Sequence, residues 1–423
     1  MNTWAMRSIC FVLFFLGFYH EAAAQEWTRF RGPNGTGESE CKTIPAQWTE
    51  KDIVWKAEIP GMGHSSPVLW GDKVFLLSAK REDATRYCVC YNAKDGKQLW
   101  QVDHPSKTHK LHQFSSFGSS TPAVDAQRVY FAWSTPEETT LLALDHDGKQ
   151  IWRKNLGRWV SQHGFGTSPI VYKDMVILNN AQDDEAPESG ERPGQSFMMA
   201  FDSKTGQERW RTPLKAKFCS YSVPMIRELP GGKAEVVCTN TNNGIYGIDV
   251  ETGEMTWSVP DCLPMRTVSS PVLAGGLIFG SCGSGKYAEN VVAAVRPGEK
   301  AALAYELKNS DKIKAPYVTS LVKRDDLLFL IYDQGFAACV DAPTGKIHWF
   351  NRTGSKFMGS PIRVDDKIYC TDEDGVVWVF AAEKEYKVLG QNPLGEPSRS
   401  TPAVAGGKMF LRTFSHLICV GSS

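Results

Sequence analysis

Ten side chains that could bind a ligand or a partner recur at one kind of position, just before a Ser/Thr-Pro step or its equivalent. Aromatic faces and cations gathered in a concave site suit an anion or a planar ligand, and they also suit a protein contact. Three hypotheses follow for these residues, which we call the funnel ring: a protein-binding surface, a small-molecule site, or side chains that only fill the axis of the fold. The predicted binding members are His64, His163, Tyr221, Arg266, Tyr317, Lys356 and Arg399, with Phe117, Phe165 and Met358 beside them.

Two loops carry further reactive groups. The loop 103–116 holds His104, His109 and His112. Two histidines three residues apart could share a metal ion on a helical turn, but no helical pattern surrounds them and no third ligand is placed. The acidic loop 182–195 is expected to be solvated. Because the chain also lacks a G-x-S-x-G elbow, a phosphate-binding loop and an H-E-x-x-H helix, we predict no catalytic residue and no metal site.

The elements that must position the funnel ring are apolar strands that open at regular intervals. Seven open at a proline and the eighth at Thr319-Ser320-Leu321, and successive openings are 40 to 55 residues apart. A period of this size is typical of a four-stranded propeller blade. The proline steps are Ser66-Pro67, Thr121-Pro122, Ser168-Pro169, Val223-Pro224, Ser270-Pro271, Ser360-Pro361 and Thr401-Pro402.

Each interval has the pattern of four antiparallel strands. Two short β-rich runs flank a two-residue turn such as Gly275-Gly276, which predicts a hairpin. A third run follows another glycine turn, and a Thr-Gly turn leads to a fourth run that contains tryptophan, as in Phe201 to Trp210. We interpret the recurring tryptophans as structural, because a large ring on an outer strand can be buried against the next blade. These docking residues are Trp55, Trp100, Trp152, Trp210, Trp257 and Trp349.

The two ends of the repeat array predict how it closes. The last unit, from Thr401, has only three strand patterns, while Asp52 to Glu58 resembles an isolated fourth strand. Pairing them would complete one blade and remove two open sheet edges. The fifth unit has Tyr305 in place of tryptophan and the seventh has lost the cassette, which a propeller tolerates since each blade packs mainly on its neighbours. We predict an all-β, eight-bladed propeller whose last blade is closed by an N-terminal strand.

Composition argues against a nucleic-acid partner, and the N-terminal segment indicates the compartment. The chain of 423 residues has a formal net charge of zero and 42% hydrophobic residues, so no nucleic-acid partner is expected. Arg7, an apolar run and Ala22-Ala23-Ala24 indicate an export signal. We expect residues 1–24 to be a signal peptide, 25–50 an irregular arm and 51–423 the propeller, without stable membrane insertion after cleavage. Ten cysteines remain, with their pairing open.

The cassette Phe201-Asp202-x-x-Thr205-Gly206-x-x-x-Trp210 resembles the tryptophan-docking repeat of the pyrroloquinoline-quinone (PQQ) propellers, the quinoprotein alcohol dehydrogenase-like superfamily. The likeness spans about residues 51–420. One branch of that superfamily comprises alcohol and glucose dehydrogenases that hold PQQ and calcium on the axis. Another comprises binding propellers without the cofactor, such as the outer-membrane assembly lipoprotein of the Bam complex. The arm Trp27 to Gly35 is also similar to the start of exported PQQ-like repeat proteins of planctomycete-type bacteria.

The chain departs from both branches. It has no adjacent cysteine pair on which PQQ could stack, since Cys88 and Cys90 are separated and fall on a strand away from the axis. No lipidation cysteine follows its leader. We therefore expect an exported, monomeric, non-catalytic scaffold of the BamB-like type that binds envelope proteins and holds no cofactor. The alternatives are a dehydrogenase for alcohols or sugars with PQQ and calcium, and a funnel that binds a sugar or another small polar ligand.

Overall fold

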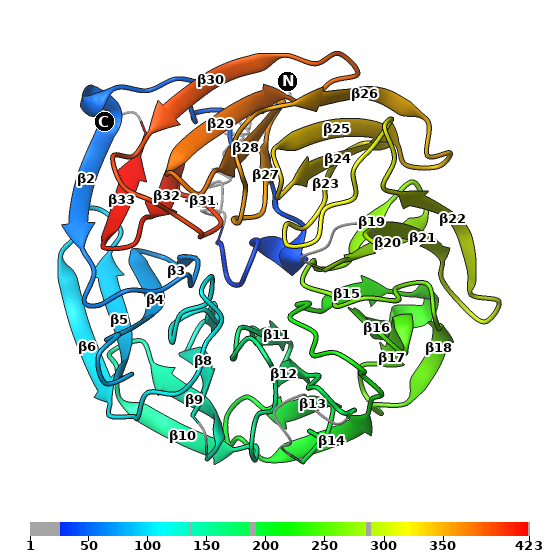
Figure 1. Cartoon of the computed structure of the whole chain (residues 1–423). Coiled ribbons are helices and arrows are strands. Elements are labelled where there is room, and N and C mark those ends of the chain that lie inside the picture. The colour runs from blue at the N-terminus through cyan, green and yellow to red at the C-terminus, as the bar shows by residue number, and fades with distance from the viewer. Residues whose placement is uncertain (1–25, 136, 186–191, 285–288, 422–423) are drawn as a thin grey trace, which may run out of the picture.

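The computed structural model is an all-β propeller in which eight sheets stand around a central axis (Figure 1). It describes residues 26–135, 137–185, 192–284 and 289–421, so the predicted leader lies outside the described residues. The sheets follow one another around the axis in chain order, and the predicted eight-bladed propeller is confirmed. Within the described ranges, no helix is long and apolar enough to cross a membrane.

In blades one to four, the strands run from the axis outward in chain order. Blades one and two comprise β3 (Val68–Trp70), β4 (Lys73–Ala79), β5 (Arg86–Asn92), β6 (Gln98–His104), β7 (Ala123–Val124), β8 (Arg128–Ser134), β9 (Thr139–Asp145) and β10 (Gln150–Asn155). Blades three and four comprise β11 (Ile170–Tyr172), β12 (Met175–Asn180), β13 (Phe197–Asp202), β14 (Glu208–Pro213), β15 (Met225–Glu228), β16 (Ala234–Asn240), β17 (Gly244–Asp249) and β18 (Met255–Val259), with the short helix η3 (Pro230–Gly232) between β15 and β16.

Blades five to eight repeat this order, except that blades seven and eight each also contain one strand from the N-terminal part of the chain. Blades five and six comprise β19 (Val272–Ala274), β20 (Leu277–Cys282), β21 (Val291–Arg296), β22 (Ala302–Lys308), β23 (Val322–Arg324), β24 (Leu327–Tyr332), β25 (Phe336–Asp341) and β26 (Ile347–Arg352). Blades seven and eight comprise β27 (Ile362–Val364), β28 (Lys367–Thr371), β29 (Val376–Ala381), β30 (Val388–Pro393), β31 (Ala403–Ala405), β32 (Lys408–Arg412) and β33 (His416–Val420).

The burial pattern explains why these runs form strands. The second strands, such as β12 and β20, are buried on both faces because a blade lies on either side of them. The outer strands alternate, as in β14, where one face packs on the neighbouring blade and the other meets solvent. Gly275 and Gly276 join β19 to β20 with φ of 54° and 74°, the left-handed backbone that a tight hairpin turn requires.

The last blade closes between the two ends of the described chain, as predicted. Strand β2 (Ile53–Glu58) pairs antiparallel with β33, from Ile53 opposite Val420 to Glu58 opposite His416. The short helix η2 (Glu50–Asp52) leads into β2, and its N-cap Thr49 exchanges hydrogen bonds with Asp52 in a capping box. The last blade is therefore a single sheet made from both ends of the array, and it lies beside the first blade (Figure 1).

The recurring tryptophans lie between successive blades. Trp152 donates its indole N–H to the carbonyl of Ser203 in blade three at 2.9 Å, and its ring lies on the turn glycine Gly206. A Cβ at Gly206 would be 2.7 Å from that ring, so the tryptophan and the glycine fit only together. The same bond to the next blade joins Trp55 to Ala93, Trp100 to His146, Trp210 to Val250 and Trp349 to Glu383.

The predicted docking residue Trp257 differs in one respect. Its indole N–H donates to the carboxylate of Glu235 in its own blade at 2.9 Å, rather than to blade five. The next turn has lost the cassette, and Gly298 there has no heavy atom within 4 Å of an added Cβ. Trp257 still belongs to one hydrophobic cluster with Ile278 and Val295 of blade five. In blade five, Tyr305 takes the tryptophan position and its hydroxyl donates to the carbonyl of Ala342.

A second set of inter-blade bonds, which we call the hydroxyl ring, encircles the axis. At seven of the eight strand openings, the N–H of the residue before the proline, or before Leu321 in blade six, donates to the side-chain hydroxyl at the same position in the next blade, at 2.9 to 3.1 Å. Seven of the eight links are present among the described residues. The eighth, from Ser168 to blade four, is missing because that position holds Val223, which has no hydroxyl. The links are Ser66 to Thr121, Thr121 to Ser168, Val223 to Ser270, Ser270 to Ser320, Ser320 to Ser360, Ser360 to Thr401 and Thr401 to Ser66.

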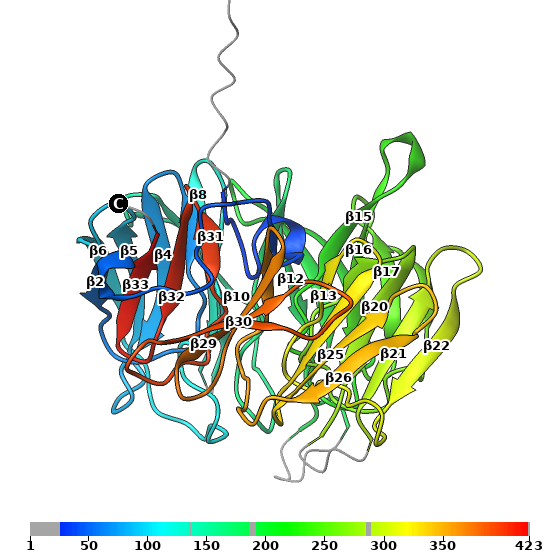
Figure 2. The same cartoon turned by 90° about the horizontal axis from the view of Figure 1, so that it is seen from above.

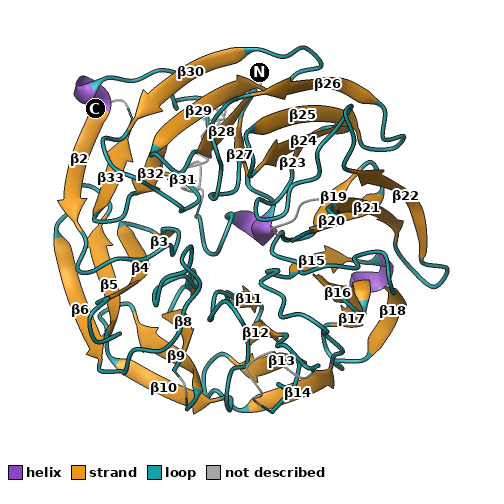
Figure 3. Ribbon diagram, viewed as in Figure 1, coloured by secondary structure: helices purple, strands orange, loops and turns teal. Residues whose placement is uncertain are grey.

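The N-terminal arm crosses one end of the axis instead of lying outside the propeller (Figure 2). Its short helix η1 (Pro33–Gly35) lies near the centre of the ring (Figure 3), and β1 (Glu38–Ser39) pairs parallel with β27. Asn34 exchanges hydrogen bonds with the backbone of Ile226 at 2.7 and 2.8 Å. The arm therefore joins innermost strands on different sides of the propeller.

Two buried arginines hold the arm in place. Arg29 donates to the carbonyl of Pro224, and Arg31 donates to the carbonyls of Leu321, Thr36 and, less closely, Pro361. Burial lowers the pKa of Arg31 to about 10, which still leaves it charged at neutral pH. A buried cation is costly unless it is hydrogen-bonded, and here carbonyls at the strand openings accept from a terminal nitrogen of each arginine.

Candidate functional site

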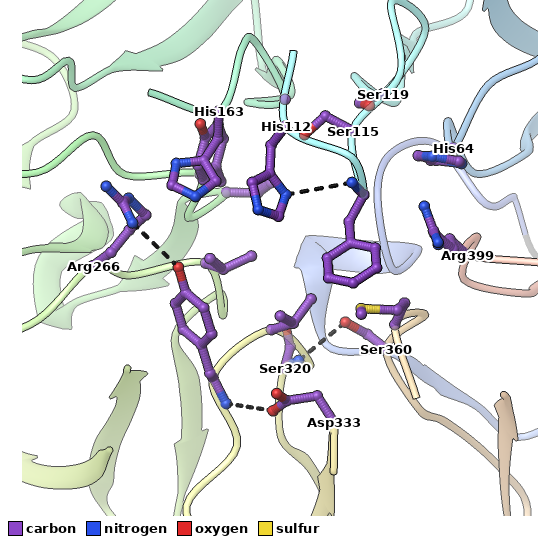
Figure 4. Close-up of a pocket in the computed structure, with 18 of the residues that line it drawn as sticks. His64, His112, Ser115, Ser119, His163, Arg266, Ser320, Asp333, Ser360 and Arg399 are labelled. Carbon is purple, nitrogen blue, oxygen red and sulfur yellow. Dashed lines mark hydrogen bonds between the residues drawn. The ribbon is translucent and has the colours of Figure 1, made fainter. Parts of the chain in front are cut away.

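An axial cavity of about 880 Å³ lies in the propeller, with Phe30 of the arm among its lining residues. Most of its wall comes from the segments that lead into the innermost strands, because those strands converge on the axis. Eight of the ten predicted funnel-ring residues line it: His64, His163, Phe165, Tyr221, Arg266, Tyr317, Met358 and Arg399. Figure 4 shows His64, His163, Arg266 and Arg399 around one space.

Lys356 and Phe117 do not line the cavity. The Lys356 ammonium group is 3.8 Å from the carboxylate of Glu373, and its side chain is 57% exposed. Phe117 packs instead beneath the guanidinium of Arg86, 4.9 Å from its ring centroid, and against His109. Both residues precede a Ser/Thr-Pro step, but their contacts lie with Arg86, His109 and Glu373, which do not line the cavity.

Arg266 and Arg399 supply the positive charge of the cavity. Arg266 lies 5.3 Å from the Phe218 ring centroid, and its nitrogens are 3.5 Å from Tyr317 Oη and from Gln162 Oε1, at the outer limit of a hydrogen bond. Arg399 lies 4.9 Å from the ring centroid of Phe114. Burial lowers the pKa of Arg399. Among the described residues, no carboxylate lies within ion-pair distance of either arginine.

The histidines of the cavity are held neutral. Burial, together with the nearby Arg399 and Arg412, lowers the pKa of His64 to about 3. Burial, with Arg266 and His112 nearby, lowers the pKa of His163 to about 3 as well. At neutral pH these rings therefore provide apolar and weakly polar surface rather than charge.

Tyr221 and Tyr317 are fixed by hydrogen bonds to their surroundings. The Tyr221 hydroxyl donates to the carbonyl of Gly164 at 2.8 Å, and burial raises its pKa well above the ordinary value. The backbone N–H of Tyr317 donates to the Asp333 carboxylate at 2.9 Å. Burial raises the pKa of Asp333. Asp333 thus helps to fix the shape of the cavity wall, because one of its carboxylate oxygens accepts the backbone N–H of Tyr317 (Figure 4).

Several residues that line the cavity were not predicted to do so from the sequence. His112 and Phe114 belong to the histidine-rich loop 103–116, which reaches the cavity so that the His112 and His163 rings lie 4.6 Å apart. Asp333 follows β24, and Phe30 belongs to the arm. The sequence indicated that this loop lies near the axis only through its position before the Thr121-Pro122 step. In the part of the chain that the structure describes, no three His, Cys, Asp or Glu side chains gather as a metal site.

The cavity fits PQQ and calcium poorly. Calcium takes six to eight oxygen ligands, whereas the acidic residues that line this cavity are Asp333 and Glu289. Asp333 already accepts a backbone hydrogen bond. The cysteines Cys88 and Cys90 lie on β5, buried between blades one and two and not on the cavity. The side chains present instead form a cationic and aromatic wall.

Fold and cavity together define an eight-bladed propeller of the PQQ-like repeat class whose axial cavity is lined by two arginines and several aromatic rings. The family model described as "Outer membrane protein assembly factor BamB" matches residues 46–132, 84–187, 192–380 and 309–416. The chain belongs to this family.

The similar proteins include both branches of the superfamily. The outer membrane protein assembly factor BamB of Burkholderia pseudomallei (strain K96243) is 23% identical over 398 residues, covering 88% of this chain and 90% of the relative. The crystal structure of BamB from Moraxella catarrhalis aligns with a TM-score of 0.60 at 14% identity, over 87% of this chain and 96% of that chain. The quinohemoprotein alcohol dehydrogenase from Comamonas testosteroni aligns with a TM-score of 0.68 at 12% identity, over 94% and 80%. At these identities the solved structures support the fold alone.

Proposed function

We propose that this chain is an exported, non-catalytic propeller that serves as a protein-binding scaffold in outer-membrane protein assembly, in the manner of BamB. The observation that carries the proposal is the match of the BamB family model across nearly the whole propeller, from residue 46 to residue 416. A curated relative named as a BamB protein aligns over most of both chains. A scaffold of this kind needs a rigid body with exposed contact groups and does not need a reaction centre.

The structure offers a contact face that suits this role. Phe114 is 42% exposed at the cavity and has Arg399 stacked on its ring. Aromatic and arginine side chains are enriched among the residues that carry most of the energy of protein interfaces. Inter-blade bonds of tryptophans and hydroxyls hold the scaffold beneath this face, so the binding groups are presented without large rearrangement.

The test is an affinity purification of the tagged, full-length chain from detergent-solubilised envelopes of the cells that produce it. We expect a defined set of envelope proteins that includes the assembly machinery of outer-membrane β-barrels. Recovery of the tagged chain alone, under conditions that preserve other envelope complexes, would contradict the proposal. A parallel assay addresses the competing dehydrogenase hypothesis. The chain, reconstituted with PQQ and calcium, should not oxidise alcohols or sugars with a dye acceptor, and robust oxidation would replace the scaffold by an enzyme.

A further inference from the structure

The charge balance of the axial cavity indicates the chemistry of what enters it. Arg266 and Arg399 contribute two cations that lie on different sides of the same space, as Figure 4 shows. The Nε atom of each is buried and has no hydrogen-bond partner within the described ranges of the chain. A guanidinium that is partly desolvated and not matched by a carboxylate gains more from an added anion than a hydrated surface arginine does.

The acidic groups near the cavity do not neutralise these arginines. Glu373 acts electrostatically on Arg399 but pairs with Lys356 at 3.8 Å. Asp333 accepts from the backbone of Tyr317 and burial raises its pKa, while Glu289 is exposed. Both arginines are therefore left without an ion-pair partner among the described residues, and each can pair with an added carboxylate.

The loop over the cavity also carries positive charge. The loop 103–116 contains Lys107 and Lys110, both exposed, and one carboxylate, that of Asp103 on β6. The same loop presents Phe114 with 42% of its surface exposed. A basic loop with an exposed aromatic ring beside a cationic cavity is complementary to an acidic chain that also carries an apolar side chain.

The size and shape of the cavity limit how the chain enters. Its volume, about 880 Å³, is in the upper part of the range of sites that enclose small ligands. Phe30 of the arm lines the cavity, and the arm, which is bound to the carbonyls of Pro224 and Leu321, crosses the axis at one end (Figure 2). Phe114 lines the cavity and is 42% exposed, so a partner can reach the cavity beside this ring. A short protruding segment fits this approach better than a chain threaded through the axis, which the arm crosses.

We propose that the axial cavity receives a protruding acidic segment of the partner protein, with carboxylates paired to Arg266 and Arg399 and an apolar side chain against Phe114. This inference rests on the proposed scaffold function, and it assigns the partner's chemistry and the place where it binds. Because there are two arginines, the segment that binds must contain at least two carboxylates close together in its sequence.

Site-specific photo-cross-linking tests this placement. The full-length chain carries Phe114→p-benzoylphenylalanine in the cells that produce it, and the adduct is digested and sequenced by mass spectrometry. The matched control is the same replacement at Ile151, which is 41% exposed on the outer strand β10. We expect an adduct at position 114 whose cross-linked peptide contains at least two Asp or Glu residues close together. A neutral or basic peptide would overturn the proposal.

The arginines are tested in the same experiment. The double variant Arg266→Gln with Arg399→Gln should lower the adduct yield about tenfold or more, since each lost charge pair is worth at least about one factor of ten. Arg266→Lys with Arg399→Lys keeps the charges and should retain most of the yield, which separates recognition from misfolding. Arg211→Gln is the control, because Arg211 lies on β14 and pairs with Glu208. Unchanged yield in the Gln double variant would contradict the inference.

The outcomes separate this inference from the scaffold function. If partners co-purify with the chain but cross-link only at Ile151 or elsewhere, the scaffold stands and the acidic segment does not. If no partner co-purifies, both fail. If the purified chain releases a small organic acid on denaturation and gives no adduct at position 114, the cavity is a small-molecule site and the proposal is overturned. A synthetic copy of the cross-linked peptide should bind about tenfold or more tightly than its Asn/Gln version.

Discussion

The hydroxyl ring predicts opposite effects for two nearly isosteric exchanges. Thr121→Val removes the hydroxyl that accepts the N–H of Ser66 at 2.9 Å. Val223→Thr adds a hydroxyl at the one position where the ring lacks it. Thr121 is 2% exposed and Val223 is 4% exposed, so both exchanges are made at buried side chains. A buried N–H left without an acceptor costs about 1–3 kcal/mol, whereas a new buried hydrogen bond contributes about 0.5–1.5 kcal/mol.

We therefore expect Thr121→Val to lower the free energy of unfolding by about 1–3 kcal/mol and Val223→Thr to raise it by about 0.5–1.5 kcal/mol. Equilibrium unfolding in guanidinium chloride, followed by tryptophan fluorescence, measures both. Val268→Thr is the control, because Val268 lines the cavity but lies outside the ring, and its hydroxyl should bring no gain. If Val223→Thr destabilised the chain as much as Thr121→Val does, the ring would not be a set of equivalent stabilising links.

Three further predictions follow from single contacts. Trp210→Phe removes the indole N–H that donates to Val250 at 2.9 Å, and we expect a loss of about 1–3 kcal/mol in the same unfolding assay, with no loss contradicting the docking role. Arg31→Ala should free the arm, which is measured as faster hydrogen exchange in residues 26–40, and unchanged exchange would show that the arginine does not hold it. The pKa values of His64 and His163 fall from an ordinary 6.5 to about 3, so between these values the unfolded chain binds protons that the native chain does not. Stability should thus fall as the pH drops below 6.5, by at most about 2 kcal/mol per histidine at pH 5, and His64→Leu should reduce that loss.

The number of blades could be predicted because the repeated patterns are local. Each Ser/Thr-Pro step and each Asp-x-x-Thr-Gly cassette is complete within a few residues, so eight openings imply eight sheets. The hydroxyl ring could not be predicted, although its residues were recognised. In each link the donor and the acceptor lie in different blades, as with Ser66 and Thr121, which are 55 residues apart. The contact therefore exists only after the propeller has closed.

The site was predicted in part for the same reason. Residues tied to the repeat, such as Arg266 and Arg399, line the cavity because the innermost strands fix the segments before them. Phe114 and Phe30 were missed as wall residues because the loop and the arm do not repeat. Lys356 occupies a repeat position but lies outside the cavity lining, where its ammonium group has Glu373 within ion-pair distance. Side-chain direction in a loop depends on such partners.

The most direct test of the scaffold function is depletion of this chain from the cells that produce it. The amount of folded β-barrel protein in the outer membrane is then measured by its resistance to unfolding in detergent at low temperature. We predict that depletion lowers this amount, that the wild-type chain restores it, and that the Arg266→Gln with Arg399→Gln variant restores it less well. An unchanged content of folded barrels after complete depletion would contradict the account.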